Sequence, residues 1–261
     1  MKTLIYAKNS LCLGLALLMG LSALVFPHTG NAQEGPTQDR VYELMAEIEN
    51  TYGIGFAYPS EWQATSANEV IQFNEYLTII LESLRRISDT LYHLGRAPDD
   101  PLRITPADYF RLHFDRAHIV IDRTIQLGGN FAGKTNPLYG EGVIIGYSIQ
   151  LTGEGMRQSF TLAHELAHVI DSLLTDLPHT QHVDFLGGEW GAVNWIPGNG
   201  YIGNEALFPR AVGGPNEDFA DTFGQMMMGK LNPLKSTAPR WLFMVLHLRG
   251  WLDAIRKLPA S

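Results

Sequence analysis

The residues with the clearest chemical potential are two histidines and a glutamate that stand close together, His164, Glu165 and His168. They lie in the segment from Met156 to Leu174, whose apolar residues recur at helical spacing without Pro or Gly. Side chains four residues apart stack on one face of a helix, so His164 and His168 can offer two imidazole nitrogens to one metal ion. Glu165 lies beside them, where it could take a proton from a water molecule at the metal. The spacing therefore predicts a metal-binding helix.

A catalytic zinc ion usually takes three protein ligands, so a third ligand is needed. Glu217 is the best candidate, because Pro215 predicts the start of a second helix that would carry Glu217 toward the metal. Asp221, one turn later on the same face, could accept the second N–H of a ligand histidine and hold its ring. The alternative third ligands stand between the two predicted helices: His182, Glu189 and Glu205.

The combined pattern resembles that of a known enzyme class. His164-Glu165-x-x-His168 followed by Asn216-Glu217-x-x-Ala220-Asp221 is similar to the gluzincin pattern of thermolysin-type zinc metallopeptidases, which are zincins. The sequence around Glu217 also resembles that of lethal-factor-like peptidases. The resemblance covers these two helices. It implies one catalytic Zn²⁺ ion bound by His164, His168 and Glu217, with Glu165 as general base. It also implies that Asp221 accepts a hydrogen bond from a ligand histidine and that the substrate is a peptide or protein.

Two further positions follow from the same comparison. Lethal-factor-like peptidases carry a Tyr shortly before the third ligand, and the nearest one here is Tyr201, in a Gly-rich stretch. We expect Tyr201 to stabilise charge on the substrate carbonyl, with Arg210 and His182 as alternatives. Asp171, one turn after His168, either supports a ligand histidine from behind or is a surface carboxylate. The extended metzincin pattern is not met, because Asp171 and Leu174 replace its Gly and His.

Hydrophobic periodicity predicts an α+β fold. Helices are expected over residues 37–50, 66–94, 156–174, 216–228 and 239–258, with a short helix near Pro106 and strands over 117–122 and 143–151. Glycines between 128 and 142 predict loops, and residues 175–214 lack periodicity, so His179 there is expected to face solvent. The second strand is either a sheet edge that receives an extended substrate or a core strand.

These elements predict a zincin-like single catalytic domain with a small mixed sheet. The helix with the two histidines would be its active-site helix, the helix over 66–94 would pack behind it, and the C-terminal part would be helical. A helix that binds a partner protein is the alternative for residues 66–94.

The N-terminus has the pattern of a secretory signal peptide. Lys2 and Lys8 precede an apolar run from Leu11 to Phe26, and Gly30-Asn31-Ala32 offers small residues for cleavage. We expect a signal peptide over residues 1–32 and the catalytic domain over 33–261, with 33–60 as a candidate N-terminal extension. The protein would be exported to the periplasm or the extracellular space. An uncleaved membrane anchor is the alternative.

The cysteine count and the net charge limit the disulfides, metal ligands and partners that the protein could have. Cys12 is the single cysteine and lies in the predicted signal peptide, so the mature chain could form no disulfide and its metal ligands must be His and carboxylates. The net charge is −8, and loss of Lys2 and Lys8 lowers it by two to −10. Nucleic acid is therefore an unfavourable partner, and so is an anionic membrane surface after signal cleavage.

The sequence thus predicts a secreted zinc-dependent peptidase with Glu165 as general base. The alternative is a non-hydrolytic secreted protein with a zincin-like fold, in which the aromatic and Gly-rich stretch after residue 175 binds a peptide or a glycan.

Overall fold

The computed structural model describes residues 35–97, 103–124, 127, 131–191, 195–201 and 213–258. Residues 35 to 261 group into one compact unit. The predicted signal peptide, residues 1–32, lies outside the described residues. Among the helices that are described, none combines the length and the apolar composition needed to cross a membrane.

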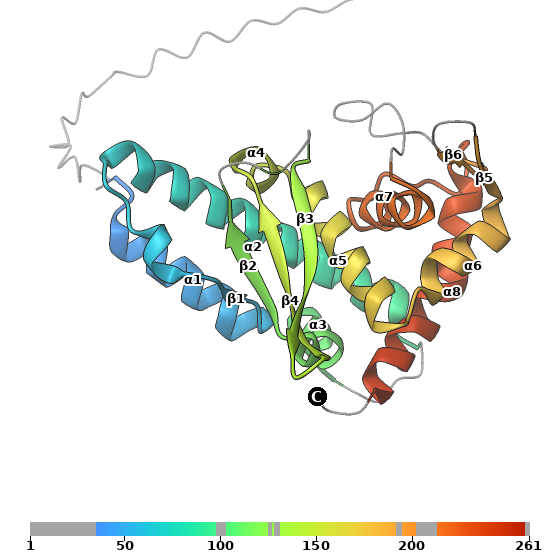
Figure 1. Cartoon of the computed structure of the whole chain (residues 1–261), viewed down its shortest axis with the longest axis horizontal. Coiled ribbons are helices and arrows are strands. Elements are labelled where there is room, and N and C mark those ends of the chain that lie inside the picture. Colours follow the sequence, from blue (N-terminus) through green and yellow to red (C-terminus); the bar gives the residue numbers. More distant parts are fainter. Residues whose placement is uncertain are drawn as a thin grey trace, which may run out of the picture. The chain divides into compact units, whose positions relative to one another are not determined.

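The described residues form eight α-helices and six β-strands (Figure 1), so the α+β class is confirmed. The helices are α1 (Gln38–Tyr52), α2 (Ala67–Gly95), α3 (Pro106–Phe114), α4 (Gly153–Met156), α5 (Ser159–Leu173), α6 (Leu177–Leu186), α7 (Pro215–Met227) and α8 (Ala238–Lys257). The strands are β1 (Gly55–Phe56), β2 (Ile119–Arg123), β3 (Gly133–Gly140), β4 (Val143–Leu151), β5 (Gly188–Trp190) and β6 (Trp195–Pro197).

The predicted helices form where capping residues and apolar spacing agree. Thr37 caps α1 by accepting from the backbone of Arg40, and Gly53 ends the helix in the left-handed conformation. Ser66 caps α2 by accepting from the backbone of Glu69. The Glu69 carboxylate accepts from the backbone N–H and the hydroxyl of Thr65.

The main sheet is mixed and has the strand order β1-β2-β4-β3. Strands β1, β2 and β4 are parallel, and β3 pairs antiparallel with β4 from Gly133 opposite Leu151 to Gly140 opposite Val143. The loops predicted between 128 and 142 are therefore wrong where β3 forms. Pro137 and the scarcity of apolar residues hid this strand, but Pro is compatible with an edge strand. Strand β4 is interior, so its reading as a core strand is confirmed and β3 is the edge.

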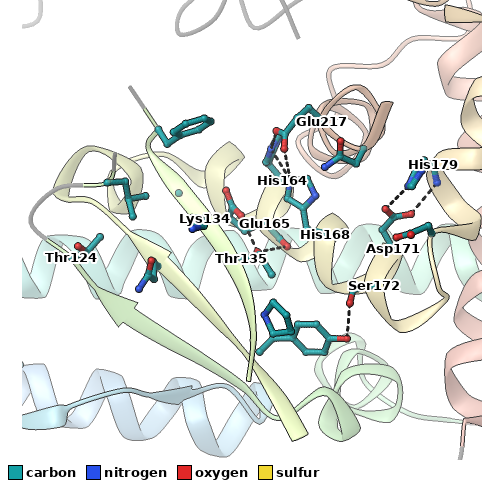
Figure 2. A pocket seen from close by; sticks show the side chains of 18 residues that line it. Thr124, Lys134, Thr135, His164, Glu165, His168, Asp171, Ser172, His179 and Glu217 are labelled. Carbon is teal, nitrogen blue, oxygen red and sulfur yellow. Dashed lines mark hydrogen bonds and ion pairs between the residues drawn. The ribbon is translucent and has the colours of Figure 1, made fainter. Parts of the chain in front are cut away.

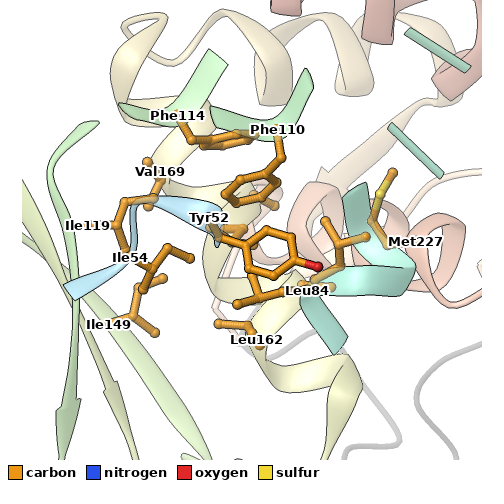
Figure 3. Close-up of a cluster of buried hydrophobic side chains, with 14 of the residues drawn as sticks. Tyr52, Ile54, Leu84, Phe110, Phe114, Ile119, Ile149, Leu162, Val169 and Met227 are labelled. Carbon is orange, nitrogen blue, oxygen red and sulfur yellow. The ribbon is translucent and has the colours of Figure 1, made fainter. Parts of the chain in front are cut away.

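The core lies between the sheet and the helices (Figure 3). Ile119 of β2 and Ile149 of β4 point from one face of the sheet toward Leu162 and Val169 of α5. Leu84 brings the buried stripe of α2 into the same cluster, so the prediction that α2 packs in the core is confirmed. Burial of each such side chain contributes roughly 1.5–3 kcal/mol, which fixes α5 against the sheet.

Helices α5 and α7 approach each other closely because small residues line their contact. Ala163, Ala167 and Ala220 are fully buried. A Cβ atom at Gly224 of α7 would lie 2.8 Å from the ring of Phe160 on α5, so only glycine fits there. This close packing brings the side chains of α7 to the histidines of α5.

The stretch from 175 to 214 was predicted to be a loop without regular structure. That prediction is wrong for its described part, which contains α6 and the two-stranded sheet of β5 and β6. Helix α6 has no clear apolar stripe. His179 and His182 make polar contacts from it, so its sequence lacks the apolar periodicity by which a helix is recognised.

Candidate metal centre

Helix α5 presents the two histidines on one face. The predicted helix is confirmed, although it begins at Ser159 and α4 precedes it as a separate turn. His164 and His168 stand one turn apart, and their Nε2 atoms lie 3.2 Å apart. Their side chains are mostly shielded from solvent, with exposed fractions of 15% and 17%. The helix therefore places two imidazole nitrogens where both could bind one metal ion.

Helix α7 brings a carboxylate to both rings. It begins at Pro215, whose fixed φ suits the first position of a helix. In its first turn, Glu217 places Oε2 3.1 Å from His164 Nε2 and Oε1 3.4 Å from His168 Nε2 (Figure 2). The residue chosen from sequence as third ligand thus lies against both histidines.

The three residues fit a zinc ion. One donor atom from each of His164, His168 and Glu217 lies within 4.8 Å of the other two. Donors that share a tetrahedral zinc ion at about 2.1 Å lie about 3.4 Å apart. The spacings here are 3.1, 3.2 and 3.4 Å, although the two contacts of Glu217 use different oxygens. The set of two nitrogens and one carboxylate, with no cysteine, also suits zinc.

The electrostatics of the cluster favour a cation. Burial alone would lower the pKa of His164, but hydrogen bonds to the Asp221 and Glu217 carboxylates raise it well above its usual range. Burial would raise the pKa of Glu217, but hydrogen bonds to His164 and His168 bring it well below its usual range. A positive charge between these groups, carried by a proton or a metal ion, is therefore strongly stabilised.

Asp221 fixes the His164 ring through the nitrogen that faces away from Glu217. Its Oδ1 accepts from Nδ1 of His164 at 3.0 Å, which leaves the Nε2 lone pair of a neutral ring directed at Glu217 and His168. Its Oδ2 accepts from the hydroxyl of Tyr201 at 3.1 Å. The structure thus brings Tyr201 to Asp221, and Tyr201 is not among the described residues that line the cleft around the cluster.

Glu165 lies on the sheet side of the histidines. Its side chain is buried, and its Oε2 accepts from the hydroxyl of Thr135 on β3 at 2.8 Å. Gly133 of β3 is equally close, since a Cβ atom there would lie 2.7 Å from Oε1 of Glu165. The edge strand therefore orients the carboxylate. Thr135 was missed from sequence because β3 itself was not predicted.

Asp171 is buried, so the reading of it as a surface carboxylate is wrong. Among the described residues its side-chain hydrogen bonds go to His179 and not to His164 or His168, so the expectation that it supports a ligand histidine is not met either. It supports His179 of α6: Oδ2 accepts from Nδ1 at 2.6 Å and Oδ1 accepts from the backbone N–H at 3.0 Å. His179 is 21% exposed, so the expectation that it faces solvent from a loop is also wrong.

The alternative third ligands lie elsewhere or outside the described residues. His182 is fully buried, and its Nε2 forms a hydrogen bond with the hydroxyl of Thr222 at 3.0 Å. Glu189 lies on β5 and forms no part of the cleft lining that the structure describes. Glu205 and Arg210 fall outside the described residues.

A buried ion pair anchors α7 from its other side. Arg240 of α8 and Asp218 are both fully buried and approach to 2.6 Å. Asp218 also accepts from the indole N–H of Trp195 at 3.1 Å and from the backbone of Gly198 at 3.4 Å. This network ties α8 and β6 to the helix that carries Glu217. It was missed from sequence, where an acidic residue inside a buried helix was its single signal.

A cleft of about 950 Å³ joins these groups. It is lined by residues of β3, α5, α6 and the start of α7, including Glu165, His168 and Glu217 (Figure 2). The proposed ligands, the proposed base and the His179–Asp171 pair therefore share one space that can admit a ligand.

Comparison of the chain with protein-family models, with curated proteins and with solved structures found no match.

Proposed function

We propose that this chain is an exported zinc-dependent peptidase of the gluzincin type with a zincin-like fold, and that His164, His168 and Glu217 bind its Zn²⁺ ion. One observation carries the proposal: the donor atoms of these three residues converge in a cleft that also contains the buried carboxylate of Glu165. A zinc ion bound there would polarise the scissile carbonyl and lower the pKa of a water molecule toward about 7.

Glu165 carries the proton in this mechanism. It takes a proton from water as the water oxygen bonds to the carbonyl carbon and the carbonyl π electrons move onto their oxygen. The C–N bond then breaks with its electron pair on nitrogen, which receives the proton from Glu165, and the C=O bond re-forms. The products are a carboxylic acid and an amine. Thr135 keeps the carboxylate oriented through its hydrogen bond to Oε2.

The backbone of β3 supports a peptide as the substrate. The N–H of Tyr147 on β4 donates to the carbonyl of His118 on the β2 side, so Pro137, opposite Tyr147, directs its backbone away from β4. Residues alternate along a strand, and Ala132 accordingly turns its carbonyl inward to Thr152.

The outward positions are therefore Gly133, Thr135 and Pro137. Gly133 and Thr135 can each offer an N–H and a carbonyl at the open edge, while Pro137 can offer only a carbonyl. An extended peptide could pair with this edge by backbone hydrogen bonds beside Glu165.

The test is a variant that spares the proposed ligands. Glu165→Gln keeps the size of the side chain and an oxygen that can accept from Thr135. We expect bound zinc, measured by elemental analysis, to stay unchanged, while cleavage of a peptide library, followed by mass spectrometry, falls by about a hundredfold or more. Glu82→Gln is the matched control, because Glu82 is exposed on α2.

Two outcomes would contradict the proposal. Full activity of Glu165→Gln would exclude the mechanism. A zinc-loaded wild-type protein that binds peptides saturably but cleaves none would favour the non-hydrolytic binding protein.

A further inference from the structure

We propose that the outer end of the β3–β4 hairpin is a distal subsite for peptide substrates, where Tyr139 and Ile144 bind an apolar side chain about four to six residues from the scissile bond. The preferred substrate is then an extended polypeptide segment rather than a short peptide. The inference rests on the proposed function, because it requires that a peptide bond is hydrolysed beside Glu165.

The hairpin continues beyond the rest of the main sheet (Figure 1). Strand β2 begins at Ile119, which is paired with Tyr147, so the part of β4 before Tyr147 pairs with β3 alone. The large apolar side chains of this outer part are exposed and form the hairpin patch: Leu138, Tyr139, Val143, Ile144 and Ile145. A contiguous exposed apolar surface of this kind is typical of a binding site.

Two residues of the hairpin patch lie on the face that adjoins the cleft. Tyr139 follows Pro137 by two residues on β3, so both side chains point to the same face, and Ile144 is the cross-strand partner of Tyr139. Pro137 and its own partner Tyr147 line the cleft. The Tyr147 hydroxyl donates to Ser172 of α5 at 3.1 Å, which places this face on the side of the active-site helix. The cleft therefore continues onto Tyr139 and Ile144.

The electrostatics of the two tyrosines agree with this placement. Burial raises the pKa of Tyr147, its hydrogen bond to Ser172 lowers it, and the nearby phenol of Tyr139 acts in the same direction as burial. Yet Tyr139 is 66% exposed and Ile144 is 37% exposed, next to a buried Tyr147. An apolar group that covered the pair would remove this surface from water, which favours binding.

The position of the pair selects for long substrates. Tyr139 follows Thr135, which contacts Glu165, by four residues, or about 13 Å along an extended strand. A peptide that pairs with the edge of β3 needs about four residues to span this distance. A peptide that ends sooner on that side cannot reach the pair.

Pro137 explains why side chains carry the binding at this end. It has no N–H to donate, and the register shifts between Leu138 and Tyr139, so backbone pairing with a substrate is weaker beyond Thr135. The same two features make this edge a poor template for a strand from a second copy of the chain. An apolar side chain of the substrate is then the group that Tyr139 and Ile144 can hold.

The test moves one leucine through a long peptide that the zinc-loaded protein cleaves at a known bond. The residues next to that bond stay constant, the rest are Gly and Ser, and Leu is placed in turn at each other position on either side. We expect kcat/KM to be about tenfold higher when Leu lies about four to six residues from the bond on one side.

Substitutions on the hairpin assign this preference to the pair. In Tyr139→Ser and Ile144→Ser the ratio of kcat/KM with and without the distal leucine should fall from about ten toward one, because the apolar contact is lost. Val143→Ser is the matched control: Val143 is 63% exposed but pairs with Gly140, so it lies on the other face. It should keep the wild-type preference.

A binding measurement makes the same comparison without turnover. Zinc-loaded Glu165→Gln is titrated into fluorescently labelled peptides with and without the distal leucine, and fluorescence anisotropy reports the affinity. We expect the peptide with leucine to bind about tenfold more tightly. Adding Tyr139→Ser to Glu165→Gln should abolish the difference.

The outcomes separate this inference from the proposed function. If the wild-type protein binds zinc but cleaves no peptide, the proposed function fails. Equal affinities of Glu165→Gln for the two labelled peptides would overturn the distal subsite independently, and so would a leucine preference that persists in Tyr139→Ser. A wild-type dimer that becomes a monomer in Tyr139→Ser, as measured by light scattering, would assign the hairpin patch to a second copy of the chain and overturn the inference as well.

Discussion

The hydroxyl of Tyr201 donates to Oδ2 of Asp221 across 3.1 Å. The other oxygen of the same carboxylate faces Nδ1 of His164 at 3.0 Å, so Tyr201 lies at the outer end of a chain of hydrogen bonds that ends at the proposed zinc ligand. Burial and the nearby charge of Asp221 raise the pKa of Tyr201, which keeps the phenol protonated as a donor.

Tyr201→Phe should therefore weaken zinc binding. Loss of the donor leaves Asp221 freer to move and loosens its hold on His164. Loss of a group hydrogen-bonded directly to a ligand lowers metal affinity by about tenfold to a hundredfold, so we expect a loss of about tenfold or less for Tyr201, which acts one contact further out. Competition with a zinc chelator measures the change. Tyr139→Phe is the control, because the side chain of Tyr139 on β3 is exposed. Unchanged zinc affinity combined with a large fall in kcat would instead support the role first expected for Tyr201, stabilisation of the substrate carbonyl.

Glu217→Ala should remove most of the bound zinc at stoichiometric metal. The variant leaves two imidazoles without the carboxylate that spans them, so the site loses one of three ligands and its negative charge. Elemental analysis after gel filtration measures the loss. Glu189→Ala on β5 should keep full occupancy. The reverse pattern would transfer the role of third ligand to Glu189.

Gly133→Ala should impair catalysis while zinc binding persists. The new methyl group would lie 2.7 Å from both Oε1 of Glu165 and Cγ2 of Thr161, so either β3 or the carboxylate must shift. We expect peptide cleavage to fall by about tenfold or more, since small displacements of catalytic groups are costly. In Gly55→Ala on β1 the new Cβ atom meets its nearest neighbour at 3.4 Å, so this control should remain active. Equal activity of the two variants would show that β3 does not set the position of Glu165.

His182 should make the fold sensitive to acid. Burial, together with the nearby charge of Arg240, lowers the pKa of His182 to about 3. In the unfolded chain the pKa of histidine is about 6.5, so below that pH the unfolded state binds a proton that the folded state excludes. The stability contributed by neutral His182 is complete above pH 6.5 and is lost as the pH falls toward 3.

Urea unfolding at pH 7 and pH 5 measures this effect. The wild type should lose about 2 kcal/mol of unfolding free energy through His182 between these pH values. His182→Gln should be less stable at pH 7 but should show a smaller decrease toward pH 5. His93→Gln, at an exposed position, should retain the wild-type decrease. An identical pH dependence in His182→Gln would contradict the burial of a neutral imidazole.

The helices were predictable where local signals agreed. Helices α2 and α7 were expected within a residue or two of their observed bounds, because apolar spacing, Ser66 and Pro215 all indicate the same ends. Strand β3 and helix α6 were not, because Pro137 and the polar contacts of His179 break the patterns by which such elements are recognised. Their stability comes from pairing with β4 and from contacts to α5 and α7, which are distant in sequence.

The sequence alone determined that His164 and His168 share one face of a helix, because four-residue spacing on an α-helix leaves no other arrangement. It also indicated Glu217 and Asp221 as their partners from a second helix. Only the tertiary structure decided what surrounds them: Thr135 at Glu165, Tyr201 behind Asp221, and His179 held by Asp171. Those contacts depend on how separate elements pack, and hydrogen bonds between side chains of separate elements leave no periodic signal in the sequence.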